Sequence, residues 1–237
     1  MIKKEILFIL KRYLPHKQKI CALTFAHGKI NIVIPQKALC EKLWPGMMVA
    51  MPLQETPNNY TASQGDIIYS PLIESKEDLF WLHHLLELCY YFLPINDQTP
   101  EIYNHVCNYF SLLTYRKYFK NYDILIQKLC IAHFLSLTGL YENSQANRLN
   151  INKHHIDSLF QQLISTFAQK ETNLDWLKLM TKNLSTVKKQ DIAYIDKCIE
   201  NGIRNHPCHK QFKTTLRPSH AQVALEDKQA QSEHSSG

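Results

Sequence analysis

The strongest constraint on the fold is a long apolar helix predicted in residues 75–94, S-K-E-D-L-F-W-L-H-H-L-L-E-L-C-Y-Y-F-L-P. Ser75 and Asp78 have the spacing of a capping box, and the carboxylate favours the positive end of a helix. Apolar side chains cover most of the helix circumference, so we expect neighbours on several sides. Pro94 ends the helix because proline lacks an N–H and restricts the residue before it. The rival interpretation, a membrane span, is disfavoured because the apolar part of this segment is shorter than the ~20 residues required and contains Glu87.

Length and composition are typical of a globular protein. The chain has 237 residues, 45% of them apolar and 20% charged, enough for one large domain or two small ones. The first residues have too short an apolar run for a secretory signal, so we expect a cytoplasmic protein. The seven cysteines are an odd number, and most lie in apolar segments, which favours buried thiols over a disulfide set.

Positive charge is concentrated before the long helix. Residues 1–70 hold nine Lys/Arg and four Asp/Glu, a net charge of +5, whereas the whole chain carries +6. This asymmetry indicates a polyanionic partner. The alternative interpretation is a slightly basic surface without a particular partner.

The first seventy residues have the pattern of a small β-structure. Short β-rich runs between turn signals predict five strands, at residues 5–10, 20–25, 29–35, 47–53 and 66–70. The A-H-G link predicts a tight hairpin turn in which Gly28 has a positive φ. Residues 56–65 have the composition of a loop. Five short strands are too few for a two-layer sandwich, so we predict a five-stranded OB-fold β-barrel over residues 1–73.

The chain after Pro71 has a helical pattern, and we predict an all-helical domain over residues 74–217. Thr99, Pro100 and Glu101 begin a second helix. Further helices are expected at residues 123–138, from 152, at 173–184 and at 191–203, with Gly139 ending the first of these. Residues 218–237 have no apolar period and predict a disordered tail. The predicted fold class is therefore α+β, an N-terminal OB-fold barrel followed by an all-helical domain.

Few residues have the pattern of a catalytic or metal site. His83 and Glu87 lie four apart on one helical face, but no second pair matches them, so an exposed helix histidine is the simpler interpretation. No CxxC pair occurs, and no zinc spacing fits the one Cys/His cluster, Cys198, His206, Cys208 and His209. Gly-rich phosphate loops, G-x-S-x-G and H-E-x-x-H are also missing from the sequence. We therefore predict no catalytic residue, no metal, no cofactor and no enzyme activity.

The basic residues of the first seventy positions form the candidate site. A small barrel with a cationic groove can follow a phosphate backbone by neutralising charge and releasing counterions. We predict sequence-independent phosphate contacts, gathered on a single outward-facing groove, from Lys11, Arg12, Lys17, Lys19, Lys29, Lys37 and Lys42. Tyr13 and Tyr60 lie near predicted strand or loop ends and suit base stacking as well as they suit the core. Phe25 lies inside a predicted strand, where an aromatic is more often core.

Three stretches, in this order, resemble the RecO family of bacterial DNA repair proteins, the recombination mediators. Residues 23–30, L-T-F-A-H-G-K-I, resemble the family's strand–hairpin–strand with its "T…GK" turn. Residues 82–94 followed by 100–113 resemble its "E-L…L-P" helix, polar loop and next helix. Residues 126–140 resemble the helix that ends in "L…GL" or "L…GY". Together the stretches span about residues 1–140.

The resemblance implies an N-terminal OB-fold and a C-terminal helical domain. It also implies binding of single- and double-stranded DNA, strand annealing, and loading of recombinase onto DNA coated by single-strand-binding protein. The implied partners are a RecR-like protein and the acidic C-terminal tail of the single-strand-binding protein. We expect no membrane partner.

Two features depart from the family pattern. Many members carry a four-cysteine zinc element after the third helix, whereas residues 141–151 contain no cysteine, so we predict no zinc. Many also carry an acidic "GE.D" before the second strand, where residues 15–19 are P-H-K-Q-K. We expect a non-catalytic, DNA-binding mediator of recombination and repair. The alternative is a helical protein-interaction adaptor that does not bind DNA.

Overall fold

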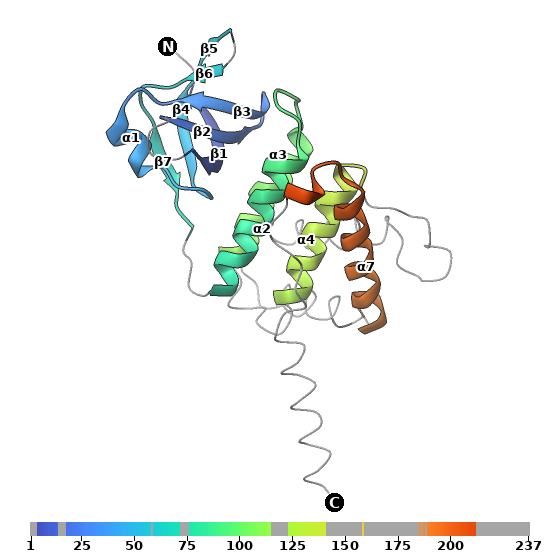
Figure 1. Ribbon diagram of the computed structural model, residues 1–237. Helices are drawn as coiled ribbons and strands as arrows, with labels where there is room; N and C mark the ends of the chain where they lie inside the picture. The colour runs from blue at the N-terminus through green and yellow to red at the C-terminus, as the bar shows by residue number, and fades with distance from the viewer. Residues whose placement is uncertain are drawn as a thin grey trace, which may run out of the picture.

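The computed structural model describes residues 4–13, 18–57, 59–71, 76–114, 123–140, 158, 185, 187 and 189–211. Within these residues a β-sheet comes first in the chain and a group of helices follows it (Figure 1). The expected α+β class with an N-terminal sheet is confirmed. None of the described helices is both long and apolar enough to cross a membrane.

Seven strands form one mixed sheet with the order β5-β6-β3-β2-β1-β4-β7. Their bounds are β1 Lys4–Arg12, β2 Lys19–Thr24, β3 Gly28–Val33, β4 Met48–Pro52, β5 Gln54–Thr56, β6 Asn59–Thr61 and β7 Asp66–Tyr69. Neighbouring strands are antiparallel except β3 and β6, which are parallel. A strand is present at each of the five predicted places.

The sheet is not closed, because β5 and β7 are its two edges, so it differs from the predicted closed five-stranded barrel. The two additional strands, β5 and β6, form a hairpin in or beside the predicted loop. The sequence around Pro57 is rich in turn residues, so its local pattern predicts a loop rather than these strands. Parallel pairing with β3 holds β6 in place, and local propensity does not predict such a contact between distant residues. Only Leu53 separates β4 from β5, so one stretch of chain pairs with β1 at one end and with β6 at the other.

Five α-helices are described along the chain. They are α1 Lys37–Lys42, α2 Lys76–Phe92, α3 Pro100–Thr114, α4 Asp123–Leu137 and α7 Lys189–Asn205, with a 3-10 turn at His209–Gln211. The short α1 was not predicted, and the expected helices at 152 onward and 173–184, the tail and Ser75 lie outside the described residues. The predicted stop at Gly139 is confirmed. Its φ is +73°, and the Leu140 N–H donates to the Leu135 carbonyl at 2.8 Å, as in a Schellman cap.

The sheet and the helices share a hydrophobic core. On β1, Leu7 and Ile9 belong to a cluster inside the sheet module, whereas Phe8 and Leu10 belong to a second cluster that continues through α2, α3, α4 and α7. The Phe8 ring lies 4.3 Å from that of Phe110 on α3. β1 is therefore buried on both faces, and its position fixes the sheet against the helices.

The β2–β3 turn meets the connection between α2 and α3 directly. Gly28 has the predicted positive φ, +66°, and a Cβ at this position would lie 1.6 Å from the Asp97 carbonyl oxygen. The Asn96 N–H donates to the Lys29 carbonyl at 2.8 Å, which joins the same two segments. Only glycine fits here, because both the backbone conformation and the close contact exclude a side chain.

Two buried histidines are part of the helical core. Burial lowers the pKa of His84 and of His105 to about 3, so both rings are neutral at neutral pH. His84 stacks on the Trp81 ring at 5.7 Å, and His105 Nδ1 lies 3.0 Å from Nδ1 of His133 on α4. These rings contribute to packing between helices rather than to a charged surface.

Candidate nucleic-acid interface

The structure divides the predicted phosphate-binding residues between the two faces of β1. One group, Lys11, Lys19 and Lys29, lies where the sheet meets α2. The other group, Arg12, Lys37 and Lys42, lies on or beside α1. Lys17 lies outside the described residues. The predicted single groove is therefore not what the structure shows.

The first group surrounds two tyrosines, and we call Lys11, Lys19, Lys29, Tyr13 and Tyr90 the junction patch. Lys11 Nζ lies 4.3 Å from the ring centroid of Tyr90 and 5.8 Å from that of Tyr13. Lys19 Nζ lies 5.5 Å from the Tyr13 ring, and Lys29 Nζ lies 5.6 Å from the Tyr90 ring. An ammonium group near an aromatic face is stabilised by ~0.5–1 kcal/mol at an exposed site. The two rings therefore hold three positive charges close together.

Among the described residues, no carboxylate pairs with a lysine of the junction patch. The Tyr13 hydroxyl donates to Asn31 Oδ1 at 3.1 Å and lies 3.3 Å from the Tyr90 hydroxyl. Burial, and then the contact with Tyr90, raises the pKa of Tyr13, so the phenol stays neutral. None of the ion pairs between described residues includes a lysine of the patch. An anion that reaches the patch therefore meets positive charge that no carboxylate of the described part of the chain pairs with.

A β-bulge explains why Lys11 belongs to this patch. The pairing of β1 with β2 shifts between Ile9 and Lys11, so Leu10 is an extra residue. Strict alternation would place Lys11 on the face of Ile9, inside the apolar cluster of the sheet module. The extra residue turns Lys11 to the face of Cys21 and α2 instead.

Lys29 has a different role from Lys11 and Lys19. Its side chain is buried, with 6% of the residue exposed, and Nζ donates to the Tyr90 carbonyl at 2.6 Å. Burial lowers the pKa of Lys29. Lys11 and Lys19 are only half-buried. The two half-buried lysines are thus the accessible cations of the patch, whereas Lys29 joins β3 to the end of α2.

The second group forms the α1 patch, which we define as Arg12, Lys37, Lys42 and Trp44. The Arg12 guanidinium lies 4.2 Å from the Trp44 ring centroid and donates to the Glu41 carbonyl at 3.2 Å. Trp44 is 54% exposed even with the Arg12 guanidinium on its ring. Lys37 Nζ is 3.8 Å from Glu41 Oε1, and the Lys42 side chain is exposed. An exposed tryptophan beside a guanidinium is the kind of platform on which an unpaired base stacks.

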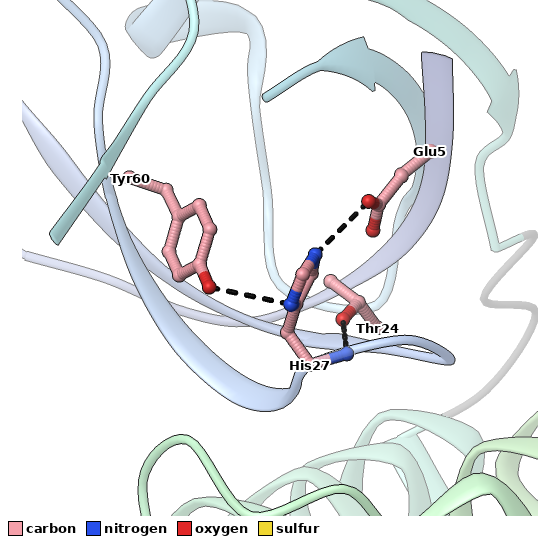
Figure 2. A network of polar contacts seen from close by, with 4 residues as sticks. All are labelled: Glu5, Thr24, His27 and Tyr60. Carbon is pink, nitrogen blue, oxygen red and sulfur yellow. Dashed lines mark hydrogen bonds and ion pairs between the residues drawn. The ribbon is translucent and has the colours of Figure 1, made fainter. Parts of the chain in front are cut away.

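The three aromatics predicted as stacking candidates have different positions. Tyr13 lies in the junction patch. Phe25 follows the end of β2 and is 54% exposed, so the expectation that it is a core residue is wrong; its ring meets Tyr103 edge-on at 5.9 Å. Tyr60 points toward His27, with its hydroxyl 3.3 Å from Nδ1, and His27 Nε2 lies 3.0 Å from the Glu5 carboxylate (Figure 2). Tyr60 thus anchors the β5–β6 hairpin to the β2–β3 turn.

Two aromatic members of the patches were not predicted from the sequence. Tyr90 lies in the long helix, where its neighbours follow the apolar pattern and give no sign of a contact with the basic residues. Its position near Pro94 places it close to the end of that helix. Trp44 lies in a W-P-G turn, where a large aromatic side chain is a signal of an exposed contact. The place of Tyr90 depends on the meeting of α2 with the end of β1, and that of Trp44 on its contact with Arg12.

The described residues contain no group of three or more His, Cys, Asp or Glu side chains that could hold a metal ion. His83 is exposed on α2 and Glu87 is half-buried one turn later. In the C-terminal Cys/His cluster, the His206 ring stacks on Phe92 at 4.0 Å. The contact of His206 with Phe92 is that of a packed side chain.

No protein-family model matches this chain, and no curated protein matches it. The resemblance to the RecO family therefore stays a prediction, and the two patches are the basis for a function.

Proposed function

We propose that this protein is a non-catalytic, DNA-binding mediator of recombination and repair that binds and anneals single-stranded DNA. The observation that carries the proposal is the junction patch, where Lys11 and Lys19 present positive charge without an ion-pair partner among the described residues. Such cations bind phosphates by releasing condensed counterions, without reading sequence.

The two patches favour a single strand over a duplex as the ligand. Lys11 and Arg12 are adjacent at the end of β1, so the patches meet at the β1–β2 end of the sheet although they face opposite sides. A flexible strand that crosses this end can place phosphates on Lys11 and Lys19 and a base on Trp44. Annealing then follows, because neutralised strands repel one another less and complementary bases can meet.

The order of strand pairing supports an OB-type module as part of the proposal. β1, β2 and β3 form an antiparallel meander, β4 returns beside β1, and β6 lies parallel to β3. An OB-fold is a partly open five-stranded Greek-key barrel. We take β4 and β5 as one strand interrupted at Leu53 and β7 as an added edge strand, which gives five barrel strands.

The remaining parts of the proposal come from the resemblance to the RecO family. They are loading of recombinase, contact with a RecR-like protein, contact with the acidic tail of single-strand-binding protein, binding of duplex DNA, and a cytoplasmic location. An experiment that rules out any one of these parts would leave the proposed binding of single strands at the junction patch unaffected.

A helical protein-interaction adaptor without DNA binding is the second candidate function. Its specific support is the pair Leu79 and Phe80 near the start of α2, which are 42% and 39% exposed. A partner that covers these side chains would need no basic residue.

Fluorescence anisotropy of a labelled single-stranded oligonucleotide, measured over a salt series, separates the two candidates. The proposed function predicts binding that weakens steeply with salt, with a slope of about −0.7 for each neutralised phosphate. Absence of binding at low salt, or a slope near zero, would favour the adaptor.

A further inference from the structure

A small polar cavity borders the junction patch and takes no part in the phosphate contacts proposed above. It measures about 210 Å³ and lies between β3, the β5–β6 hairpin and the loop from α2 to α3. Each of these three elements contributes an asparagine, Asn31, Asn59 and Asn96, and we call the cavity the asparagine pocket. Sites for whole small molecules usually measure ~300–1,000 Å³, so this pocket has room for a single ring group.

The hydrogen-bonding groups of the pocket are amides and one carboxylate. The Tyr13 hydroxyl donates to Asn31 Oδ1 at 3.1 Å, which leaves the two N–H donors of that amide for a ligand. Among the described residues, the side-chain amides of Asn59 and Asn96 make no hydrogen bond to protein. Glu55 also lines the pocket, and its carboxylate accepts hydrogen bonds and repels anions. The pocket therefore suits a neutral group with donors and acceptors on one edge.

Two apolar residues complete the mostly polar lining. They are Ile95 and Pro57, and Ile95 is 56% exposed. Ile95 forms a parallel bridge with Lys29, and Asn96 has a φ of +60°, so the loop backbone is fixed beside β3. Tyr60, which also lines the pocket, is held by its contact with His27, which in turn contacts Glu5 (Figure 2).

We infer that the asparagine pocket binds one unstacked nucleobase that carries an exocyclic amino group, such as cytosine or adenine, rather than thymine. Glu55, Asn59 and Asn96 bring acceptor oxygens to the pocket, and an exocyclic amino group offers them two N–H donors, whereas the edge of thymine offers one. The hydrogen bond between Tyr13 and Asn31 connects the pocket to the junction patch, so a nucleotide can have its phosphate on Lys11 or Lys19 and its base in the pocket.

The inference rests on the proposed function in one respect only, namely that a bound single strand of DNA supplies the base. It adds a base preference to binding that is otherwise independent of sequence. Because a nucleoside has no phosphate, it tests the pocket without the lysines, whereas an oligonucleotide tests both.

The first arm of the test titrates the full chain with deoxycytidine and with thymidine and follows amide signals by nitrogen-15 NMR. We expect deoxycytidine, and not thymidine, to shift the side-chain amide signals of Asn31, Asn59 and Asn96. The double variant Asn59→Ala/Asn96→Gly retains Asn31 and should abolish the shift of the Asn31 signal, and glycine keeps the positive φ at residue 96. The variant Asn104→Ala, on the exposed surface of α3, should keep the shifts. Shifts that are absent, or that survive in the double variant, would overturn the inference.

The second arm compares the affinities of oligo(dC) and oligo(dT) of equal length. We expect about a 10-fold preference for oligo(dC), at the low end of what one well-placed hydrogen-bonded pair provides, and a preference below about 2-fold in Asn59→Ala/Asn96→Gly. Deoxycytidine binding without oligonucleotide binding would support the pocket and overturn the proposed function. Equal affinities for oligo(dC) and oligo(dT), without binding of the nucleoside, would support the proposed function and overturn the pocket.

Discussion

The two basic patches lie on opposite faces of one strand and differ in how their charge is held. In the junction patch, Lys11 and Lys19 lie over neutral tyrosine rings, and no ion pair between described residues involves them. In the α1 patch, Glu41 is 3.8 Å from Lys37 through its carboxylate and accepts from Arg12 through its carbonyl. Among the described residues, the lysines of the junction patch have no carboxylate neighbour within ion-pair distance whereas Lys37 of the α1 patch has one, although the two patches contain the same number of basic residues.

This difference shows that the surroundings of a lysine, rather than its presence, decide what it contributes. An exposed lysine with a carboxylate one helical turn away has a weak, solvent-screened partner and little net effect. A lysine over an aromatic ring keeps its full charge and has a preferred position. A third environment, that of Lys29, removes the side chain from the surface altogether.

The largest expected effect belongs to Lys29, and it concerns stability. Lys29→Glu places a carboxylate near the Tyr90 carbonyl in a buried site, and we expect a loss of ~3–5 kcal/mol of unfolding free energy, the range for an uncompensated buried charge. Urea unfolding followed by circular dichroism measures this loss. Lys29→Met, which keeps the apolar stem, should cost less, and an unchanged midpoint for both variants would show that Lys29 is not a buried contact.

Charge reversal at the accessible lysines compares the patches directly. We expect Lys11→Glu/Lys19→Glu to weaken binding of single-stranded DNA by on the order of 100-fold at moderate salt while the protein stays folded. The matched control is Lys37→Glu/Lys42→Glu, which changes the charge equally at the α1 patch and should weaken binding by about 10-fold or less. Equal losses in anisotropy titrations would show that the two faces do not differ.

Trp44 tests the stacking part of the α1 patch. We expect Trp44→Ala to weaken binding about 10-fold, since stacking on an aromatic ring contributes ~1–3 kcal/mol per base. The salt slope should stay the same, because tryptophan carries no charge. Trp44→Phe should restore most of the affinity. A changed slope would mean that Trp44 acts by positioning Arg12, whose guanidinium lies on its ring.

The smallest effect is expected from the pair Lys37 and Glu41. Lys37→Ala should weaken DNA binding by less than about 2-fold, because Glu41 already screens the lysine. Glu41→Ala should strengthen binding by a similar factor, since it releases Lys37. Competition anisotropy, with wild type and variant measured side by side, resolves differences of this size. A larger loss of DNA affinity in Lys37→Ala would show that the α1 patch contributes more to binding than we expect.

Much of the fold could be predicted from local sequence, because local rules decide it. Pro94, the T-P-E helix start and Gly139 fix helix ends by backbone chemistry, and these ends are found where predicted. The hairpin of β5 and β6 could not be predicted, because its pairing partner β3 is about thirty residues away. The bulge at Leu10 also depends on how β1 pairs with β2, which no single strand encodes.

The candidate site was predicted in composition but not in geometry. The basic surplus before the long helix contains the lysines of both patches, yet strand alternation separates Lys11 from Arg12. The burial of Lys29 follows from contact with α2, more than sixty residues later, and no pattern around Lys29 itself indicates that contact. Tyr90 was missed for the same reason.

The central claim is that phosphates of a single strand lie on Lys11 and Lys19. The most direct test compares the salt dependence of oligonucleotide binding for wild type and for the charge-neutral variant Lys11→Gln/Lys19→Gln. If both lysines neutralise phosphates, the slope of log K against log salt becomes shallower by about 1.4, at ~0.7 for each lost contact. Parallel lines would contradict the claim, because the strand would then be bound elsewhere on the protein.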